Sequence, residues 1–252
     1  MPLKWRLRCS TPPSAAPESG LPAGSTCCRD SGCWKWWILP NLLFLILLLL
    51  ASPFDLSIER RFFSDGHFVE NGVTRWFYDY GFLPIVAMGG ALLVLIALLV
   101  PRCRNLWRPG LFLFFTTLLG LAIITHLLLK DHWGRPRPVQ IEQFGGTQDY
   151  RPFYAPDWSW TIQPFKSFPS GHAANGYSLI ALAFVGRRHG SKALQWTGIS
   201  LGAVGGTTMG MMRMAQGAHF LTDVLGGAWV IWFSSQLCDW IIYKNFHRKS
   251  VC

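Results

Sequence analysis

Charged residues are scarce in this sequence. Only 14% of its 252 residues are Asp, Glu, Lys or Arg, whereas 50% are hydrophobic, and about a quarter would be charged in a typical soluble protein. Long uncharged runs exclude a soluble globular protein and predict an all-α integral membrane protein. There is no internal repeat and no nucleic-acid-binding motif. Because the basic residues cluster in short connections between apolar runs, the net charge of +10 does not predict a nucleic-acid partner.

Six apolar runs are long enough to cross a bilayer as helices. They are residues 34–53, 81–100, 111–129, 171–186, 194–212 and 220–243. The connections 101–110 and 187–192 are short and basic, so the positive-inside rule places them and both termini in the cytoplasm. The connections 54–80, 130–170 and 213–219 are then expected to face outward.

The two ends of the chain are expected to lie outside the membrane domain. Residues 1–33 are rich in Pro, Ser and Gly and lack a periodic apolar pattern, which predicts a disordered cytoplasmic tail. Residues 34–243 would form one six-helix membrane domain, and residues 244–252 a short basic cytoplasmic tail. The run 34–53 could also be a signal peptide, but the long segment before it and the later spans favour an uncleaved helix.

Cysteine is absent from the connections expected to face outward. The seven cysteines lie in the segments assigned to the cytoplasm or, for Cys238, near the cytoplasmic end of the last expected helix. This distribution fits free thiols in a reducing compartment. The cluster of Cys27, Cys28 and Cys33 could bind a metal ion, but no second pair with matching spacing accompanies it.

The stretch 213–223, RMAQGAHFLTD, places an arginine, a histidine and an aspartate beside an apolar run. His219 and Asp223 are four residues apart and would share a helix face, so the carboxylate can orient one imidazole nitrogen. The other nitrogen is then available as a nucleophile or general base. Arg213 carries a planar guanidinium suited to phosphate. A capped helix start with a buried His–Asp hydrogen bond would have the same pattern.

The fifth expected span carries a stripe of glycines at every fourth position: Gly198, Gly202, Gly206 and Gly210. Small residues at this spacing allow helix backbones to approach closely in lipid. Arg213 continues the same face by one turn. We therefore expect its side chain to point into the bundle, where a guanidinium requires an anionic partner.

A second polar patch, KDHWGRPRP, starts at Lys130. It contains Lys130, Arg135 and Arg137, three cations on the side of the membrane where positive charge is disfavoured, which suggests an anionic ligand. Cations at a helix end can also simply extend to the interface. His126, one turn before Lys130, is expected to be a buried and hydrogen-bonded histidine.

A third polar patch, FPSGH, covers residues 168–172. Ser170 is a natural N-cap for the following helix. The backbone N–H groups of Gly171 and His172 would be unpaired at that helix start, and such groups bind phosphate well. A plain serine cap would explain Ser170, but it would not explain a histidine at the membrane surface.

The predicted topology returns all three patches to the same face of the membrane. Together they would supply several donors to an oxyanion and two histidines, one of them beside a carboxylate. This inventory fits phosphoryl transfer through a phosphohistidine. Asp131 and Asp157 do not form a metal-binding set with the histidines, so neither a metal ion nor another cofactor is expected.

The three patches read Lys130-x6-Arg137-Pro138, Pro169-Ser170-Gly171-His172 and Arg213-x5-His219-x3-Asp223. They resemble the three-part signature of the type 2 phosphatidic acid phosphatase (PAP2) family. By this resemblance, His219 would attack phosphorus, Asp223 would orient His219, and His172 would protonate the leaving oxygen and later activate water. The phosphate oxygens would be held by Lys130, Arg137, Ser170, Gly171 and Arg213. The family needs no metal.

The sequence departs from the family pattern at one position. Met212 stands where the family usually has a serine before the arginine, so one hydrogen bond to phosphate would be missing or supplied by another group. The departure bears on rate or substrate choice more than on the class of reaction. Vanadium haloperoxidases share the helical fold, but they are soluble in character.

An outward-facing site at the bilayer surface favours a lipid phosphate as substrate. In a bacterial inner membrane with the site facing the periplasm, the candidates are lipid A phosphate, undecaprenyl pyrophosphate and phosphatidylglycerol phosphate. The aromatic-rich segment 139–168 could cover a head group or only anchor the connection in the interface, and it is similar to that of lipid A phosphatases.

Two functions other than a lipid phosphatase remain open: a phosphotransferase that uses another lipid as acceptor, and a non-catalytic lipid-phosphate binder or transporter. Intact His172, His219 and Asp223 argue against the latter. The oligomeric state is not predicted.

Overall fold

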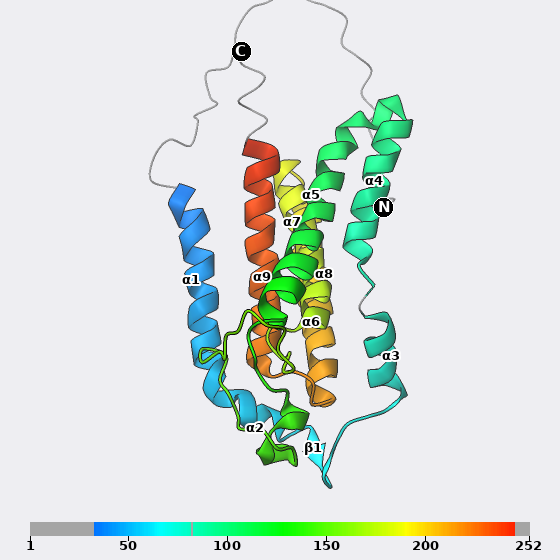
Figure 1. The fold of residues 1–252 in the computed structure, drawn as a ribbon. Helices are drawn as coiled ribbons and strands as arrows, with labels where there is room; N and C mark the ends of the chain where they lie inside the picture. The colour runs from blue at the N-terminus through cyan, green and yellow to red at the C-terminus, as the bar shows by residue number, and fades with distance from the viewer. Residues whose placement is uncertain (1–32, 82, 245–252) are drawn as a thin grey trace, which may run out of the picture.

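The computed structural model describes residues 33–81 and 83–244, most of which are helical (Figure 1). The tails predicted at 1–33 and 244–252 lie outside the described residues, apart from Cys33 and Lys244 at their inner ends. Cys27 and Cys28 also lie outside the described residues, so the metal-binding alternative for this cluster stays untested. The expected all-α class holds for the described chain except for one short hairpin.

Nine α-helices make up the described chain: α1 (Cys33–Ala51), α2 (Asp55–Glu59), α3 (Gly72–Tyr80), α4 (Ile85–Leu99), α5 (Trp107–Thr117), α6 (Gly171–Tyr177), α7 (Ala181–Arg188), α8 (Lys192–Ala215) and α9 (Leu221–Asp239). A π-helical segment, Leu118–Lys130, continues α5, and a single 3-10 turn, Ser178–Ile180, joins α6 to α7. The hairpin pairs β1 (Phe63–Ser64) with antiparallel β2 (His67–Phe68). Its turn residues Asp65 and Gly66 both have positive φ, the backbone that an Asp-Gly hairpin turn adopts.

Three helical stretches are long and apolar enough to cross a membrane, judged by length and composition: Trp37–Glu59, Gly72–Leu99 and Pro101–Lys130. They overlap the first three expected spans, which were 34–53, 81–100 and 111–129. The other three expected spans are also helical, in α6–α7, α8 and α9, and their crossing of the membrane stays a prediction. Exposed leucines on α1 and α4, such as Leu39 and Leu98, suit a lipid environment.

The first span continues further than the sequence suggested. We expected a polar connection to begin at residue 54, but Ser52–Phe54 form a 3-10 turn that leads directly into α2. Proline is tolerated at this point because the first turn of a helix does not need its N–H. The result is that Asp55 and Glu59 of α2 are fully buried.

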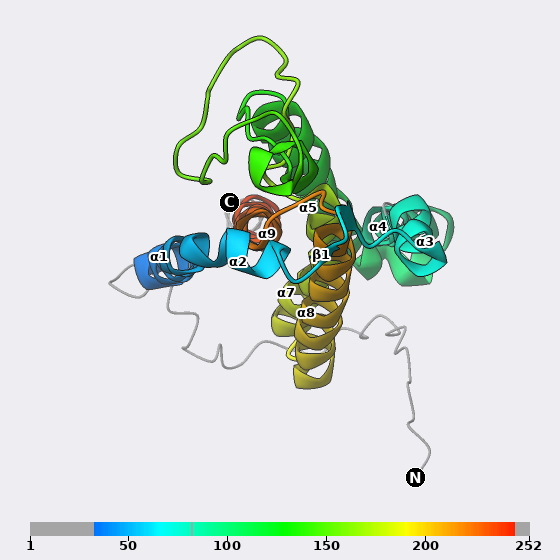
Figure 2. The same cartoon turned by 90° about the horizontal axis from the view of Figure 1, so that it is seen from below.

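Helix α9 lies in the middle of the bundle, with α1 on one side and α8 on the other (Figure 2). Helix α8 packs against α6 and α7 through its glycine stripe, and all four glycines are buried, as expected. A Cβ atom added at Gly206 would lie 2.3 Å from the ring of Tyr177. Helices α4 and α5 also meet at glycines, because a Cβ atom at Gly90 would lie 2.7 Å from the carbonyl oxygen of Gly110. Close backbone approach therefore replaces large side chains at both contacts.

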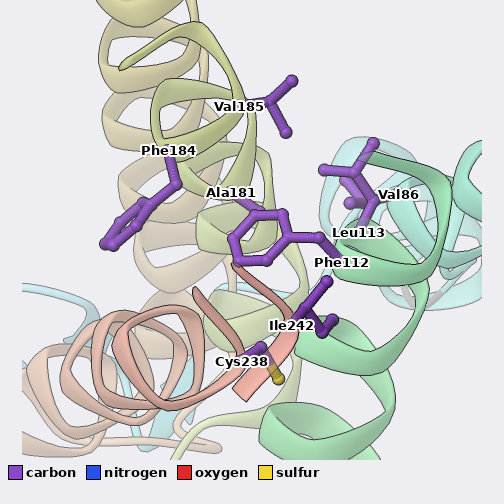
Figure 3. Close-up of a cluster of buried hydrophobic side chains, with 8 residues drawn as sticks. All are labelled: Val86, Phe112, Leu113, Ala181, Phe184, Val185, Cys238 and Ile242. Atoms are coloured by element: carbon purple, nitrogen blue, oxygen red, sulfur yellow. The ribbon is translucent and has the colours of Figure 1, made fainter. Parts of the chain in front are cut away.

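Two apolar clusters follow one another along the bundle, and Ile180 packs against both. The first joins α4, α5, α7 and the end of α9, and its buried members are Val86, Phe112, Leu113, Ala181, Phe184, Val185, Cys238 and Ile242 (Figure 3). The second joins α6, α8 and α9, with Ala173, Tyr177, Met214, Val224 and Ile231 among its members. The second cluster lies directly behind the first turns of α6 and α9, and so it supports the residues of the candidate site.

Candidate active site

The three polar patches converge at one end of the bundle, where α8 ends and α9 begins, at the lower end of the molecule in Figure 1. The backbone N–H of Ser170, before α6, donates to the carbonyl oxygen of Asp223 at 2.9 Å. The backbone N–H of Ala218 donates to the carbonyl oxygen of Arg213 at 3.0 Å. The first bond holds the second and third motifs together although about fifty residues separate them, and the second bond closes the turn within the third motif.

His219 and Asp223 lie side by side and are both buried. His219 Nδ1 lies 3.6 Å from Asp223 Oδ2, which is ion-pair distance but longer than a formed hydrogen bond. Contacts of this kind commonly shorten when substrate binds. The four-residue spacing does bring the carboxylate to Nδ1, which leaves Nε2 as the nitrogen for chemistry. The shared helix face predicted from the sequence is not formed, because His219 lies before Phe220, the N-cap of α9.

Asp223 is held by more donors than His219 alone. Its Oδ2 accepts a hydrogen bond from Ser167 Oγ at 2.6 Å and another from the backbone N–H of Phe220 at 2.8 Å, while Oδ1 accepts one from Arg135. A carboxylate with several charged or polar donors is fixed in orientation and stays ionised. The candidate orienting group is therefore rigid in this structure.

The imidazole of His219 is neutral at physiological pH. Its burial, together with the cations Lys130 and Arg213, lowers its pKa to about 3, although Asp223 acts in the opposite direction. A neutral ring keeps a lone pair on one nitrogen, which is the state a nucleophile requires.

A cluster of three cations adjoins this pair through Lys130 and Arg213. Lys130 and Arg213 are buried, Arg137 is partly buried, and all three lie close enough to interact electrostatically with one another. Within the described residues, none of them forms an ion pair with a carboxylate of the chain. Arg213 points into the bundle, as expected, where it donates to Gln216 and lies with its Cζ 4.8 Å from the centre of the Tyr78 ring. A cluster of like charges without acidic partners suits a multiply charged anion.

His172 and Ser170 begin α6 at the edge of the same cluster. Ser170 Oγ caps the helix by accepting from the N–H of Ala173, as expected. The ring of His172 stacks on the ring of Tyr78, with centroids 5.6 Å apart, and its Nε2 lies 3.2 Å from the Tyr78 carbonyl oxygen. Tyr78 thus lies between His172 and Arg213. Sequence reasoning did not single out this tyrosine, because nothing in the polar segment 54–80 marks it as a site residue.

Arg135 takes a different position from the one its charge suggested. The sequence grouped it with Lys130 and Arg137 as a candidate for anion binding, but its side chain is fully buried and pairs with Asp55 and Asp223. Asp55, Ser167 and Thr222 belong to the same network and were missed. A signal for Asp55 does exist in the sequence, since an acidic residue directly after an apolar span is costly unless it is paired.

Two further sequence expectations concern Asp131 and His126, which flank Lys130. Asp131 forms an ion pair with Lys166 at 2.6 Å. His126 was expected to be buried, but it is only partly buried, because its side of the helix is incompletely covered. Among the described residues, no group of three or more His, Cys, Asp or Glu side chains could hold a metal ion.

The aromatic segment 139–168 is divided between core and surface. Phe144 and Phe153 are buried and pack against neighbouring segments. Trp158 and Trp160 lie around the ring of His132, at centroid distances of 5.7 and 5.8 Å, and Trp160 is 78% exposed. The segment therefore combines a part packed against the protein with an exposed indole surface, and the choice between covering a head group and anchoring in the interface stays a prediction.

Comparison with known proteins gives a consistent picture. Residues 109–247 match the model of the PAP2 superfamily. The chain is 30% identical to a lipid A 4'-phosphatase of Francisella tularensis subsp. novicida over 221 residues, which cover 86% of this chain and 93% of that protein. It is 35% identical to lipid A 4'-phosphatases of Rhizobium leguminosarum and Rhizobium etli over about half of this chain, and over 47% and 42% of those proteins. No solved structure gave a significant match.

Proposed function

Because the chain belongs to the PAP2 superfamily and is a membrane lipid phosphatase, we propose that it hydrolyses a phosphate monoester of lipid A through a phosphohistidine on His219. One observation carries the proposal. His219, with Asp223 beside it, adjoins a cluster of three buried or partly buried cations that form no ion pair with a carboxylate of the described chain. The relatives named above are lipid A 4'-phosphatases, which supports this substrate over undecaprenyl pyrophosphate and phosphatidylglycerol phosphate.

The proposed reaction has two steps. His219 Nε2 attacks phosphorus and the bond between phosphorus and the sugar oxygen breaks, while His172 gives a proton to that oxygen. Asp223 accepts the Nδ1 hydrogen bond and stabilises the positive charge that develops on the ring. His172 then removes a proton from water, which attacks the phosphohistidine and releases inorganic phosphate and neutral His219.

The remaining site residues act on the phosphate oxygens. We assign this role to Lys130, Arg137, Ser170, Gly171 and Arg213, since each lies at the end of an element that meets the others beside His219. Fixed cations stabilise the negative charge of the transferring phosphoryl group at little reorganisation cost. No step in this scheme calls on a metal ion.

The proposed placement in the cell follows the charge pattern. Six helices would cross the bacterial inner membrane within a single domain of residues 34–243, with both termini in the cytoplasm and the site at the periplasmic face. A lipid substrate could then reach the cations laterally from the outer leaflet, with its head group beside the exposed indoles of the segment 139–168.

Substitution of the proposed nucleophile tests the function. We expect His219→Ala to abolish phosphate release from lipid A in detergent micelles, and His189→Ala, an exposed histidine at the other end of the bundle, to leave it unchanged. Undecaprenyl pyrophosphate and phosphatidic acid are assayed in parallel, and the protein's unfolding temperature confirms that each variant is folded. An acid-labile phosphoenzyme should be trapped by alkaline quenching of the wild type but not of His219→Ala.

Three results would contradict the proposal. Wild-type turnover by His219→Ala would remove the nucleophile. Loss of activity in EDTA with recovery on adding a divalent cation would contradict the metal-free scheme. Appearance of the phosphate on a second lipid, in place of inorganic phosphate, would favour the phosphotransferase alternative with the same site.

A further inference from the structure

The arginine at position 135 is fully buried between two carboxylates that come from distant parts of the chain. Its Nη2 donates to Asp55 Oδ2 at 2.7 Å, and its Nη1 donates to Asp223 Oδ1 and to Thr222 Oγ1, the latter at 2.8 Å. Its Nε donates to the carbonyl oxygen of Arg151 at 2.9 Å. All three nitrogens of the guanidinium are thus used in fixed directions, an arrangement that a lysine could not reproduce.

Asp55 is fixed equally well. Its Oδ1 accepts from the backbone N–H of Thr222 at 3.0 Å, and its Oδ2 accepts from Thr222 Oγ1 at 2.6 Å and from the Tyr150 hydroxyl at 3.2 Å. Burial and the neighbouring Asp55 carboxylate raise the pKa of Tyr150 to about 12, so its hydroxyl remains a donor. The network therefore connects α2, the segment 131–170 and the first turn of α9.

The network ends on the residue that orients the proposed nucleophile. Of the two oxygens of Asp223, Oδ1 is bound by Arg135 and Oδ2 faces His219 Nδ1. The guanidinium therefore both sets the rotation of the carboxylate and withdraws negative charge from it. The ring of Phe220, 4.4 Å from the Arg135 Cζ, covers the guanidinium.

We propose that Arg135 and Asp55 are positioning residues for the reaction: together they hold Asp223 in the orientation that His219 needs and set how strongly Asp223 attracts a proton onto the His219 ring. This inference rests on the proposed function of His219. It assigns no contact with substrate to either residue. It distinguishes Arg135, which acts through Asp223, from Arg137 two positions later, which remains with the phosphate-binding cations.

Removing a charge from this network should move the acid limb of the pH–rate profile. The direction of the shift depends on whether the removed charge is positive or negative. Without the Arg135 charge, the Asp223 carboxylate stabilises the protonated form of His219 more strongly. His219 is then protonated, and therefore inactive, at a higher pH. Removal of the Asp55 charge has the opposite effect, because Arg135 then acts on Asp223 alone. The other ionisable groups around the pair are Glu59 on α2, Lys130, Arg137 and Lys166 from the segment after α5, His172 on α6 and Arg213 on α8, and they are unchanged in these variants.

The experiment compares pH–rate profiles of the full-length protein in detergent with lipid A as substrate. We expect Arg135→Gln to lower kcat about 10- to 100-fold and to move the acid limb up by about 0.5 to 1 pH unit. Asp55→Asn should move the limb down. Arg135→Lys keeps the charge but loses the fork, so kcat should fall while the limb stays near that of the wild type.

A matched control uses another arginine of the same segment. Arg151 forms an ion pair with Asp157 at 3.0 Å, and both side chains are partly exposed. Because its side chain lies outside the network, Arg151→Gln should keep the wild-type profile. It removes the same charge as Arg135→Gln and leaves the Arg151 carbonyl oxygen in place.

The outcomes separate positioning from simple structural support. Opposite shifts for Arg135→Gln and Asp55→Asn support the inference, since acid unfolding of a destabilised variant can move the limb only upward and cannot produce the downward shift of Asp55→Asn. Unshifted profiles in the folded variants, or an equal shift in Arg151→Gln, overturn it. If Arg135→Gln does not fold, Asp55→Asn and Arg135→Lys decide in the same way. Loss of activity in His219→Ala with no shift in these variants would overturn this inference and leave the proposed function intact.

Discussion

His219 has a pKa of about 3 in the folded protein because burial and the nearby cations disfavour its charged form, whereas an exposed imidazole titrates near 6.5. The unfolded chain therefore binds a proton below about pH 6.5 that the folded protein does not accept until about pH 3. Stability from this group is fully present above pH 6.5 and is lost as the pH falls toward 3. At pH 5 the loss amounts to about 2 kcal/mol.

Substitution of His219 should therefore reduce the acid sensitivity of folding. We expect the unfolding temperature of His219→Gln in detergent to fall less between pH 7.5 and pH 5.0 than that of the wild type. The exposed His67 provides the control, and His67→Gln should follow the wild type. An equal fall in all three proteins would show that His219 is not buried in its neutral form.

The different roles of Arg135 and Arg137 could not be predicted from the sequence. Both belong to one short basic stretch, GRPRP, so composition and spacing give them the same meaning. An extended chain places residues two apart on the same side, so local geometry does not separate the two arginines. Which of them meets an acid depends on Asp55, eighty residues earlier. His219 and Asp223 could be paired from the sequence because they lie four positions apart, although His219 precedes α9 and the expected helix face is absent. The Arg135 network depends on long-range packing.

At the scale of helices, the glycine face of α8 offers a direct test of packing. A Cβ atom at Gly198 would lie 2.4 Å from the backbone nitrogen of Ala183 in α7, and neither backbone can easily move. At Gly205 the nearest atom, the carbonyl oxygen of Gly176, would be 3.4 Å away. The two glycines lie in the same helix but differ in the space available to a methyl group.

We expect Gly198→Ala to destabilise the protein by about 1 to 3 kcal/mol through overpacking. Gly205→Ala should change stability by less than about 1 kcal/mol, since alanine also favours the helix. Thermal unfolding in detergent measures both. Equal effects would mean that close contact between α8 and α7 does not depend on the buried stripe.

Helix α2 could not be predicted in the same way as the glycine face. The stripe follows from a period of four, which helix geometry converts directly into one face. The segment 55–59, DLSIE, alternates polar and apolar residues over only five positions, which is too short a pattern to distinguish a helix from a connection. Their helix forms where Asp55 finds Arg135 and Thr222, partners that become neighbours only after the bundle has assembled.

At the scale of the whole molecule, the candidate site and the basic connection 101–110 occupy opposite ends of the bundle (Figure 1). This separation agrees with the alternation of basic and mixed-charge connections, which predicts that the two ends lie on opposite sides of the membrane. The orientation matters for function, because a site at the periplasmic end meets lipid in the outer leaflet of the inner membrane, and a site at the other end does not.

Single cysteines at the two ends test this orientation. In a variant with all native cysteines replaced by serine, we introduce Asp149→Cys, in the segment beside the site, or Asn105→Cys, in the basic connection; both positions are exposed. A membrane-impermeant maleimide added to cells with a permeabilised outer membrane should label the first variant and should label the second only after the inner membrane is lysed. Labelling of the Asn105→Cys variant alone in unlysed cells would place the site in the cytoplasm. Labelling of both would show that the bundle does not separate two compartments, because no lipid barrier would then lie between its ends.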